Sequence, residues 1–184
     1  MEAIDTFLFY LINRLAGSNT LIDTIFIAIS QYSLPILVIS LFFTFIVFFK
    51  KREIKMVVIF SIISALLSEM IAKGVSLFYY HTQPFARLSH VNQLISKTVD
   101  NAFPSDHATV FFGVLMMFFF STKGPKRWFF PILAFLVGLS RIWVGVHSPV
   151  DIVVGALLGS LTAWCVYHFL PIFSNVPVRK HQLK

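Results

Sequence analysis

Long apolar runs separated by short polar segments dominate the chain. Residues 34–49 are apolar without interruption, and residues 56–80 form a second long run that Glu69 and Lys73 break late. Further apolar runs follow at 108–121, 128–139 and 150–173. A helix needs about 20 apolar residues to cross a bilayer. The pattern therefore predicts an all-α protein that crosses the membrane several times.

The first 32 residues leave more than one interpretation open. Residues 4–16 have an apolar face, and residues 21–32 are apolar but short; each stretch contains an aspartate. A half-span, a helix in the membrane interface and a complete first span all fit this pattern. We therefore expect a single domain over residues 1–184 that forms a bundle of five to six transmembrane helices.

Composition supports the membrane assignment. Hydrophobic residues make up 57% of the 184 positions, and charged residues make up only 12%. A soluble domain is ordinarily about 45–50% apolar and about 25% charged. The chain therefore lacks the polar surface that a soluble enzyme or a disordered protein needs. Its single cysteine, Cys165, excludes an intramolecular disulfide scaffold.

The net charge of +7 is concentrated in three segments. The 50–55 loop, the 122–127 loop and the tail at 179–184 hold ten of the fifteen basic residues. Short loops rich in lysine and arginine stay in the cytoplasm, so these segments predict a cytoplasmic C-terminus rather than a nucleic-acid partner. The 81–105 loop and the 140–149 hinge then share the outer face.

Three polar clusters fall on that predicted outer face, where ionisable residues are costly. The first is Ser140-Arg141-x5-His147-x3-Asp151. A carboxylate four residues after a histidine can hold one imidazole nitrogen and leave the other as a nucleophile or base. The alternatives are that Asp151 only caps a helix that begins near Ser148 and that Arg141 extends to the headgroups.

The second cluster is Phe103-Pro104-Ser105-Asp106-His107. Pro104 and Ser105 are typical of a helix start, whose free N–H groups can bind an anion. His107 in the first turn could donate a proton to a leaving oxygen. Alone, the segment fits an ordinary helix cap in which Asp106 favours the helix dipole.

The third cluster is Lys73, followed by Gln83-Pro84-Phe85. An ion pair between Lys73 and Glu69 is the simpler interpretation of this lysine. Together, however, the clusters supply two histidines, a carboxylate, cations, a hydroxyl and helix N-termini. That set suits phosphoryl transfer. The sequence has no cluster of metal ligands at these sites and no glycine-rich nucleotide loop, so we expect neither a metal nor a cofactor.

These residues resemble the type 2 phosphatidic acid phosphatase (PAP2) superfamily, whose motifs are Lys-x6-Arg-Pro, Pro-Ser-Gly-His and Ser-Arg-x5-His-x3-Asp. The third motif matches at every fixed position over residues 140–151. The second matches at residues 104–107, except that Asp106 stands in place of glycine. The first is degraded: Lys73 is present at a longer spacing, and Gln83 replaces the arginine.

The Phe-Pro-Ser-Asp-His, Gln-Pro-Phe and Ser-Arg-Ile-Trp-Val-Gly-Val-His segments resemble the BcrC-type undecaprenyl pyrophosphate phosphatases, which are associated with bacitracin resistance in Gram-positive bacteria. The resemblance implies that undecaprenyl pyrophosphate is the substrate and that its terminal phosphate is removed at the outer leaflet of the bacterial cell membrane. The product would be the recycled carrier lipid for cell-wall synthesis.

The resemblance also implies roles. His147 attacks the phosphorus and forms a phosphohistidine, Asp151 orients His147, and His107 protonates the leaving group and then activates water. The phosphate oxygens would be bound by the N–H groups that follow Ser105 and by Lys73, Ser105 and Arg141.

Three further residues complete the expected substrate site. Gln83 replaces a cation with a neutral amide, and Arg87, four residues on, is the expected substitute. Asp106 would orient a cation or the flanking loop. Two other functions stay open: a phosphatase for another lipid, such as phosphatidylglycerophosphate or phosphatidic acid, and a transport subunit, which only the several spans favour.

Overall fold

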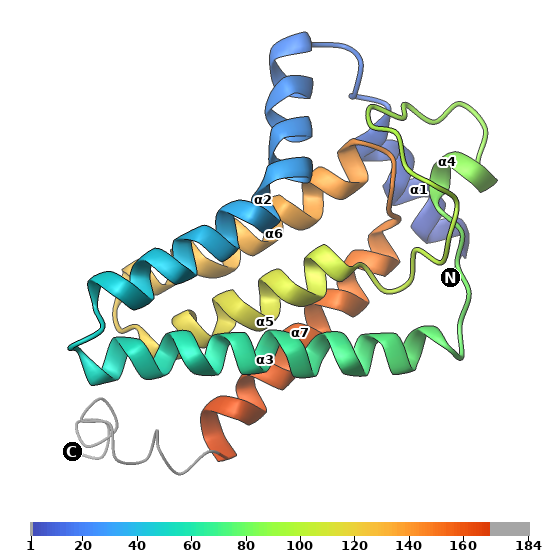
Figure 1. Cartoon of the computed structure of the whole chain (residues 1–184). Helices are drawn as coiled ribbons and strands as arrows, with labels where there is room; N and C mark the ends of the chain where they lie inside the picture. Colours follow the sequence, from blue (N-terminus) through green and yellow to red (C-terminus); the bar gives the residue numbers. More distant parts are fainter. Residues whose placement is uncertain (1, 170–184) are drawn as a thin grey trace.

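The structure is a computed structural model that describes residues 2–169 (Figure 1). Seven α-helices form this part: α1 (Glu2–Asn13), α2 (Thr20–Val47), α3 (Arg52–Ser76), α4 (Pro84–Arg87), α5 (Asp106–Ser121), α6 (Phe129–Trp143) and α7 (Pro149–Phe169). A 3-10 helix, Pro125–Trp128, leads into α6. Three of these helices, α2, α3 and α7, are long and apolar enough to cross a membrane. The predicted all-α membrane bundle is confirmed.

Helix α5 lies at the centre of the bundle and packs against α3, α6 and α7. Its contact with α7 depends on glycine. A Cβ placed at Gly159 of α7 would lie 2.5 Å from the carbonyl oxygen of Thr109 and 2.7 Å from the amide nitrogen of Gly113. Gly155 approaches α5 in the same way, with the carbonyl oxygen of Ser105 at 2.8 Å. The small residues therefore let the backbones of α5 and α7 come into contact.

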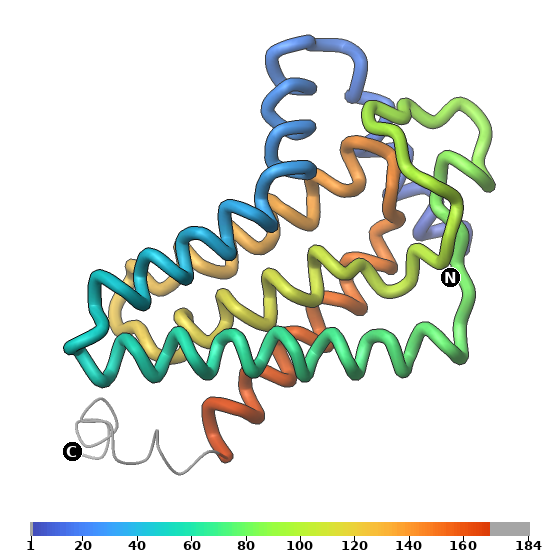
Figure 2. Tube along the Cα trace, viewed as in Figure 1, coloured from blue at the N-terminus to red at the C-terminus, as the bar shows by residue number. Residues whose placement is uncertain are grey.

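Helix α2 corrects the expected start of the first long span. It begins at Thr20 rather than at residue 34, so residues 21–32 are its first half and not a separate crossing. Asn19 caps it by accepting the N–H groups of Leu21 and Ile22. Pro35 lies inside the helix, and Figure 2 shows that α2 bends along its length. Proline removes one helical hydrogen bond and commonly kinks a helix.

Helix α1 is a short helix that lies at the same end of the bundle as the long segment between α3 and α5. Its twelve residues extend about 18 Å at 1.5 Å per residue, which is too short to cross a bilayer, so of the interpretations left open for the first 32 residues α1 alone does not fit a complete span. Asn13 is fully buried and donates to the carbonyl oxygens of Trp143, at 2.9 Å, and Asn92, at 3.0 Å. The backbone N–H of Asn92 in turn donates to the side-chain oxygen of Asn13 at 2.9 Å. One asparagine thus holds α1 against the segment between α4 and α5 and against the end of α6.

The connections divide between two ends of the bundle (Figure 1). The long segment between α3 and α5, the α6–α7 connection and α1 lie at one end, and the turns at 48–51 and 122–128 lie at the other. Helix α3 stops at Ser76, earlier than the predicted run to residue 80. The basic tail at 179–184 lies outside the described residues.

Candidate active site

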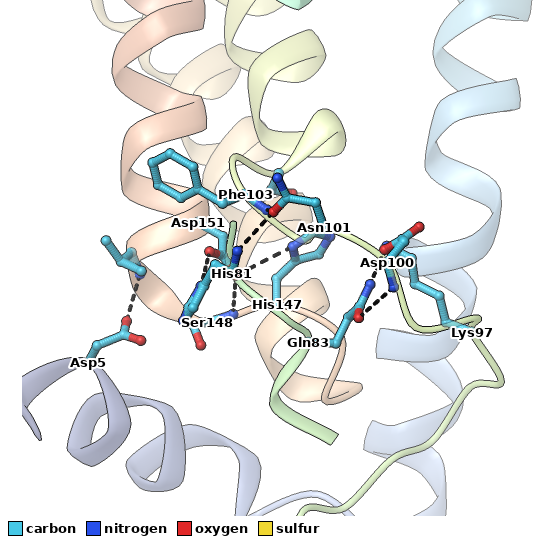
Figure 3. A network of polar contacts seen from close by, with 12 residues as sticks. Asp5, His81, Gln83, Lys97, Asp100, Asn101, Phe103, His147, Ser148 and Asp151 are labelled. Carbon is cyan, nitrogen blue, oxygen red and sulfur yellow. Dashed lines mark hydrogen bonds and ion pairs between the residues drawn. The ribbon is translucent and has the colours of Figure 1, made fainter. Parts of the chain in front are cut away.

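His147 and Asp151 meet where α6 turns into α7 (Figure 3). His147 lies in the connection, and Asp151 is in the first turn of α7. The imidazole Nδ1 lies 3.6 Å from Asp151 Oδ2, within ion-pair range, and it has no hydrogen-bond partner. His147 is 4% exposed and Asp151 is 0% exposed. The two residues are thus close, with the ring not yet hydrogen-bonded to the carboxylate.

The Asp151 carboxylate instead accepts two other hydrogen bonds. The backbone N–H of Ser148 donates to Oδ2 at 2.8 Å, which is the helix cap that the sequence offered as an alternative. The ring Nδ1 of His81 lies 2.7 Å from Oδ1. His81 comes from the segment after α3, seventy residues away, and no motif in the sequence pointed to this contact.

Arg141 is buried in the last turn of α6, where α2 holds its guanidinium. Its Nη1 donates to the Ser30 hydroxyl at 2.6 Å and to the Ser30 carbonyl at 3.0 Å. Its Nε is buried without a hydrogen-bond partner. The cation is therefore fixed on one side and keeps donor capacity on the other.

The start of α5 lies directly against the start of α7. Ser105 is the N-cap residue of α5, and its backbone N–H donates to the carbonyl oxygen of Asp151 at 3.1 Å. Its hydroxyl is fully buried and has no hydrogen-bond partner. His107, one residue into α5, feels the charges of Arg141 and His147. The structure thus brings His107, Ser105, Arg141, His147 and Asp151 together.

Lys73 and Asp106 form an ion pair across α3 and α5. Lys73 Nζ lies 2.8 Å from Asp106 Oδ1 and 3.2 Å from Glu69 Oε1. The residue that replaces the motif glycine therefore faces the motif lysine. Both side chains are more than half exposed, so this cation can reach a ligand at the end of the bundle.

Gln83 and Arg87 each have hydrogen-bond partners of their own. Gln83 is fully buried, and its amide exchanges two hydrogen bonds with Asp100. Arg87 donates to the Ser148 hydroxyl at 2.8 Å and pairs with Asp5 at 3.4 Å. The Gln83 bonds join two parts of the segment between α3 and α5, whereas Arg87 ties this segment to α1 and to Ser148, the residue after His147.

Lys97 is a cation of the site that the sequence reasoning missed. It pairs with Asp100 at 3.8 Å, and its charge acts on Asp106, His107 and His147. Burial lowers the pKa of Lys97, while the charge of Asp100 opposes that shift. The residue lies in a loop without periodicity, so only the folded chain shows its place.

The electrostatics of His147 favour its neutral form. Burial lowers the pKa of His147, and the charge of Arg141 acts in the same direction, while Asp151 opposes the shift. A neutral imidazole can act as a nucleophile, whereas a protonated one cannot. Within residues 2–169, no three histidine, cysteine or acidic side chains gather as a metal site requires.

A buried histidine, an adjacent carboxylate, a second histidine and fixed cations at the end of a membrane bundle define a phosphoryl-transfer site. The PAP2 superfamily model matches residues 54–174, and the chain belongs to this family. It is 37% identical to "Bacitracin transport permease protein BcrC" of Bacillus licheniformis, over 94% of this chain and 83% of that protein.

Two other similarities extend the comparison. The chain is 31% identical to "Undecaprenyl-diphosphatase BcrC" of Bacillus subtilis (strain 168), over 89% of this chain and 80% of the relative. The crystal structure of Aquifex aeolicus LpxE matches with a TM-score of 0.74 and 28% identity, over 89% of this chain and 94% of that one. Both the sequence and the fold are thus those of PAP2 membrane proteins.

Proposed function

We propose that this protein is a lipid pyrophosphate phosphatase that removes the terminal phosphate of undecaprenyl pyrophosphate through a phosphohistidine. The observation that carries the proposal is the buried pair of His147 and Asp151 beside His107 and Arg141. The name of the Bacillus subtilis relative supports the substrate.

The proposed reaction has two displacements. His147 Nε2 attacks the terminal phosphorus, and the bond from that phosphorus to the bridging oxygen breaks as His107 protonates the departing lipid phosphate. His107 then takes a proton from water, whose oxygen attacks the phosphohistidine and breaks its P–N bond. Asp151 stabilises the positive charge that His147 carries in between.

The cations and donors around the nucleophile would hold the phosphate oxygens. Arg141 and Ser105 each keep an unpaired buried donor, and the free N–H groups at the start of α5 favour an anion. Lys73 supplies an exposed charge whose partner is Asp106. Fixed donors of this kind stabilise the charge of a transferring phosphoryl group.

An apolar groove next to these donors supports a lipid substrate. Helices α2, α5 and α6 enclose a space of about 360 Å³ whose lining includes Ile29, Leu37 and Val137. Ile29 precedes Ser30, the partner of Arg141, and Val137 is one turn before Arg141. A polyprenyl tail in this groove would place its pyrophosphate near the arginine.

The charge pattern supports an orientation in the bacterial cell membrane. The 50–55 and 122–127 loops are rich in basic residues, so they would face the cytoplasm, as would the C-terminus. The candidate site at the opposite end would then lie on the extracellular face. There it would return undecaprenyl phosphate to cell-wall synthesis and confer bacitracin resistance.

The test is phosphate release in detergent from undecaprenyl pyrophosphate, a diacyl phosphate and a short soluble phosphate. We expect the highest kcat/KM for the first, and loss of activity in His147→Ala and His107→Ala proteins that remain folded. Full activity in either variant would refute the mechanism. A higher kcat/KM for the diacyl phosphate would identify that lipid class as the substrate instead. Bacitracin resistance that persists in a His147→Ala strain would favour a transport function.

A further inference from the structure

His81 makes a buried contact that the proposed reaction does not yet use. Its ring Nδ1 lies 2.7 Å from Asp151 Oδ1, and its side chain is 11% exposed. Asp151 Oδ2 accepts the N–H of Ser148 at 2.8 Å and is the oxygen nearest to His147. Each carboxylate oxygen therefore has its own donor, and together the two donors fix the plane of the carboxylate.

The backbone around His81 is itself held in place. Its N–H donates to the Asn101 side chain at 3.0 Å, and its carbonyl accepts the N–H of Ala102 at 2.8 Å. Asn101 also donates to the carbonyl oxygens of Ser76 and Tyr79. Figure 3 shows His81 between Asn101 and Asp151. The ring therefore reaches Asp151 from a fixed segment.

The orientation of Asp151 matters because His147 is not yet hydrogen-bonded to it. A small turn of the carboxylate decides whether Oδ2 can accept the His147 Nδ1–H as positive charge develops on the ring. Loss of the His81 donor would leave a buried carboxylate oxygen unpaired, which is costly. The carboxylate would then turn toward another donor and away from His147.

We propose that His81 is a positioning residue that aims the Asp151 carboxylate at the nucleophile His147. This inference rests on the proposed function. Because His81 would act on the reaction only through Asp151, its loss should lower kcat and leave KM nearly unchanged. A residue that only holds the loop would alter the shape of the substrate site, and its loss would raise KM as well.

Two substitutions distinguish the contribution of the His81 hydrogen bond from that of the bulk of its ring. His81→Phe fills the same space without a donor, whereas His81→Asn places an amide nitrogen where Nδ1 was. We expect His81→Phe to lower kcat on undecaprenyl pyrophosphate by about 10- to 100-fold, as for loss of a hydrogen bond to a charged group. His81→Asn should stay within about threefold of wild type. His90→Asn, at an exposed histidine of the same segment, is the matched control and should not change kcat.

A double-mutant cycle with Asp151→Asn tests whether the effect of His81 on kcat passes through Asp151. If His81 acts through Asp151, His81→Phe should cause little further loss in the Asp151→Asn background. Should His81→Phe not fold in detergent, His81→Ala takes its place in the same comparison. Unchanged kcat in the donor-free variant, or equal losses in the phenylalanine and asparagine variants, would overturn the inference. Wild-type protein without activity on this lipid would overturn the proposed function and this inference together.

Discussion

Among the glycines, Gly159 leaves the least room for an added Cβ. An added Cβ would lie 2.5 Å from the Thr109 carbonyl oxygen, whereas ordinary contact begins at 3.4 Å. The Gly113 amide nitrogen at 2.7 Å is also backbone and cannot rotate away. Gly159→Ala should therefore force α5 and α7 apart by roughly 0.9 Å at this point.

The separation has two effects of calculable size. Overpacking a filled interface costs about 1–3 kcal/mol, while alanine in a helix regains about 1 kcal/mol over glycine. A net loss of up to about 2 kcal/mol follows from these figures. Gly159 lies about two turns after Asp151 in α7, and His107 lies in α5, so a change in the spacing of these helices changes the spacing of the catalytic groups. A misplacement of about 1 Å between catalytic groups can lower the rate about 100-fold, so a fall in kcat of about 10-fold or more is expected.

The assay is thermal unfolding in detergent together with kcat for phosphate release. Gly74→Ala is the control, since Gly74 lies in α3 and nothing lies within 4 Å of an added Cβ there. We expect the control to keep its kcat and to keep or slightly raise its Tm, and Gly159→Ala to lose both in part. Wild-type Tm and kcat in Gly159→Ala would refute the close packing of α5 and α7.

Three other predictions follow from the site. Arg141→Lys keeps the charge but loses the planar fork that reaches Ser30, so kcat/KM should fall about 10- to 100-fold; an unchanged value would contradict this. Lys97→Met removes a charge near the phosphate site, and KM should rise about 3- to 10-fold at low salt, with kcat within twofold; equal KM values would exclude a role in binding. Because the pKa of His147 is lowered by burial, the neutral ring persists as pH falls. The acidic limb of the kcat/KM profile should therefore lie below the ordinary histidine pKa of about 6.5, and a midpoint above that value would disprove the shift.

Much of the site could be predicted because its residues are neighbours in sequence. His147 and Asp151 are four residues apart across a helix start, so short-range geometry brings them together. Ser105 and His107 flank the first residue of α5, and a proline before the serine indicates that start. Hydropathy likewise predicted the helical bundle, since long apolar runs have few other structures in a membrane.

The remainder depends on contacts between distant segments. The loop between α3 and α5 has no periodicity, so the positions of His81 and Lys97 follow from hydrogen bonds such as that of Asn101 to Ser76. The Ser30 contact of Arg141 required α2 to begin before residue 34. Gln83 and Arg87 were expected to bind the phosphate, and their bonds to Asp100, Asp5 and Ser148 follow from the folded chain rather than from a motif.

The hydrogen bonds of Asn13 have a consequence for biosynthesis. Helix α1 is made before the groups that satisfy Asn13, because these belong to Asn92 and Trp143, which come much later in the chain. Until α6 is in place, the amide of Asn13 needs water, and a twelve-residue helix cannot cross the bilayer. Helix α1 can therefore reach its final position only after the chain has been made as far as Trp143, and its docking completes the end of the bundle that carries the site.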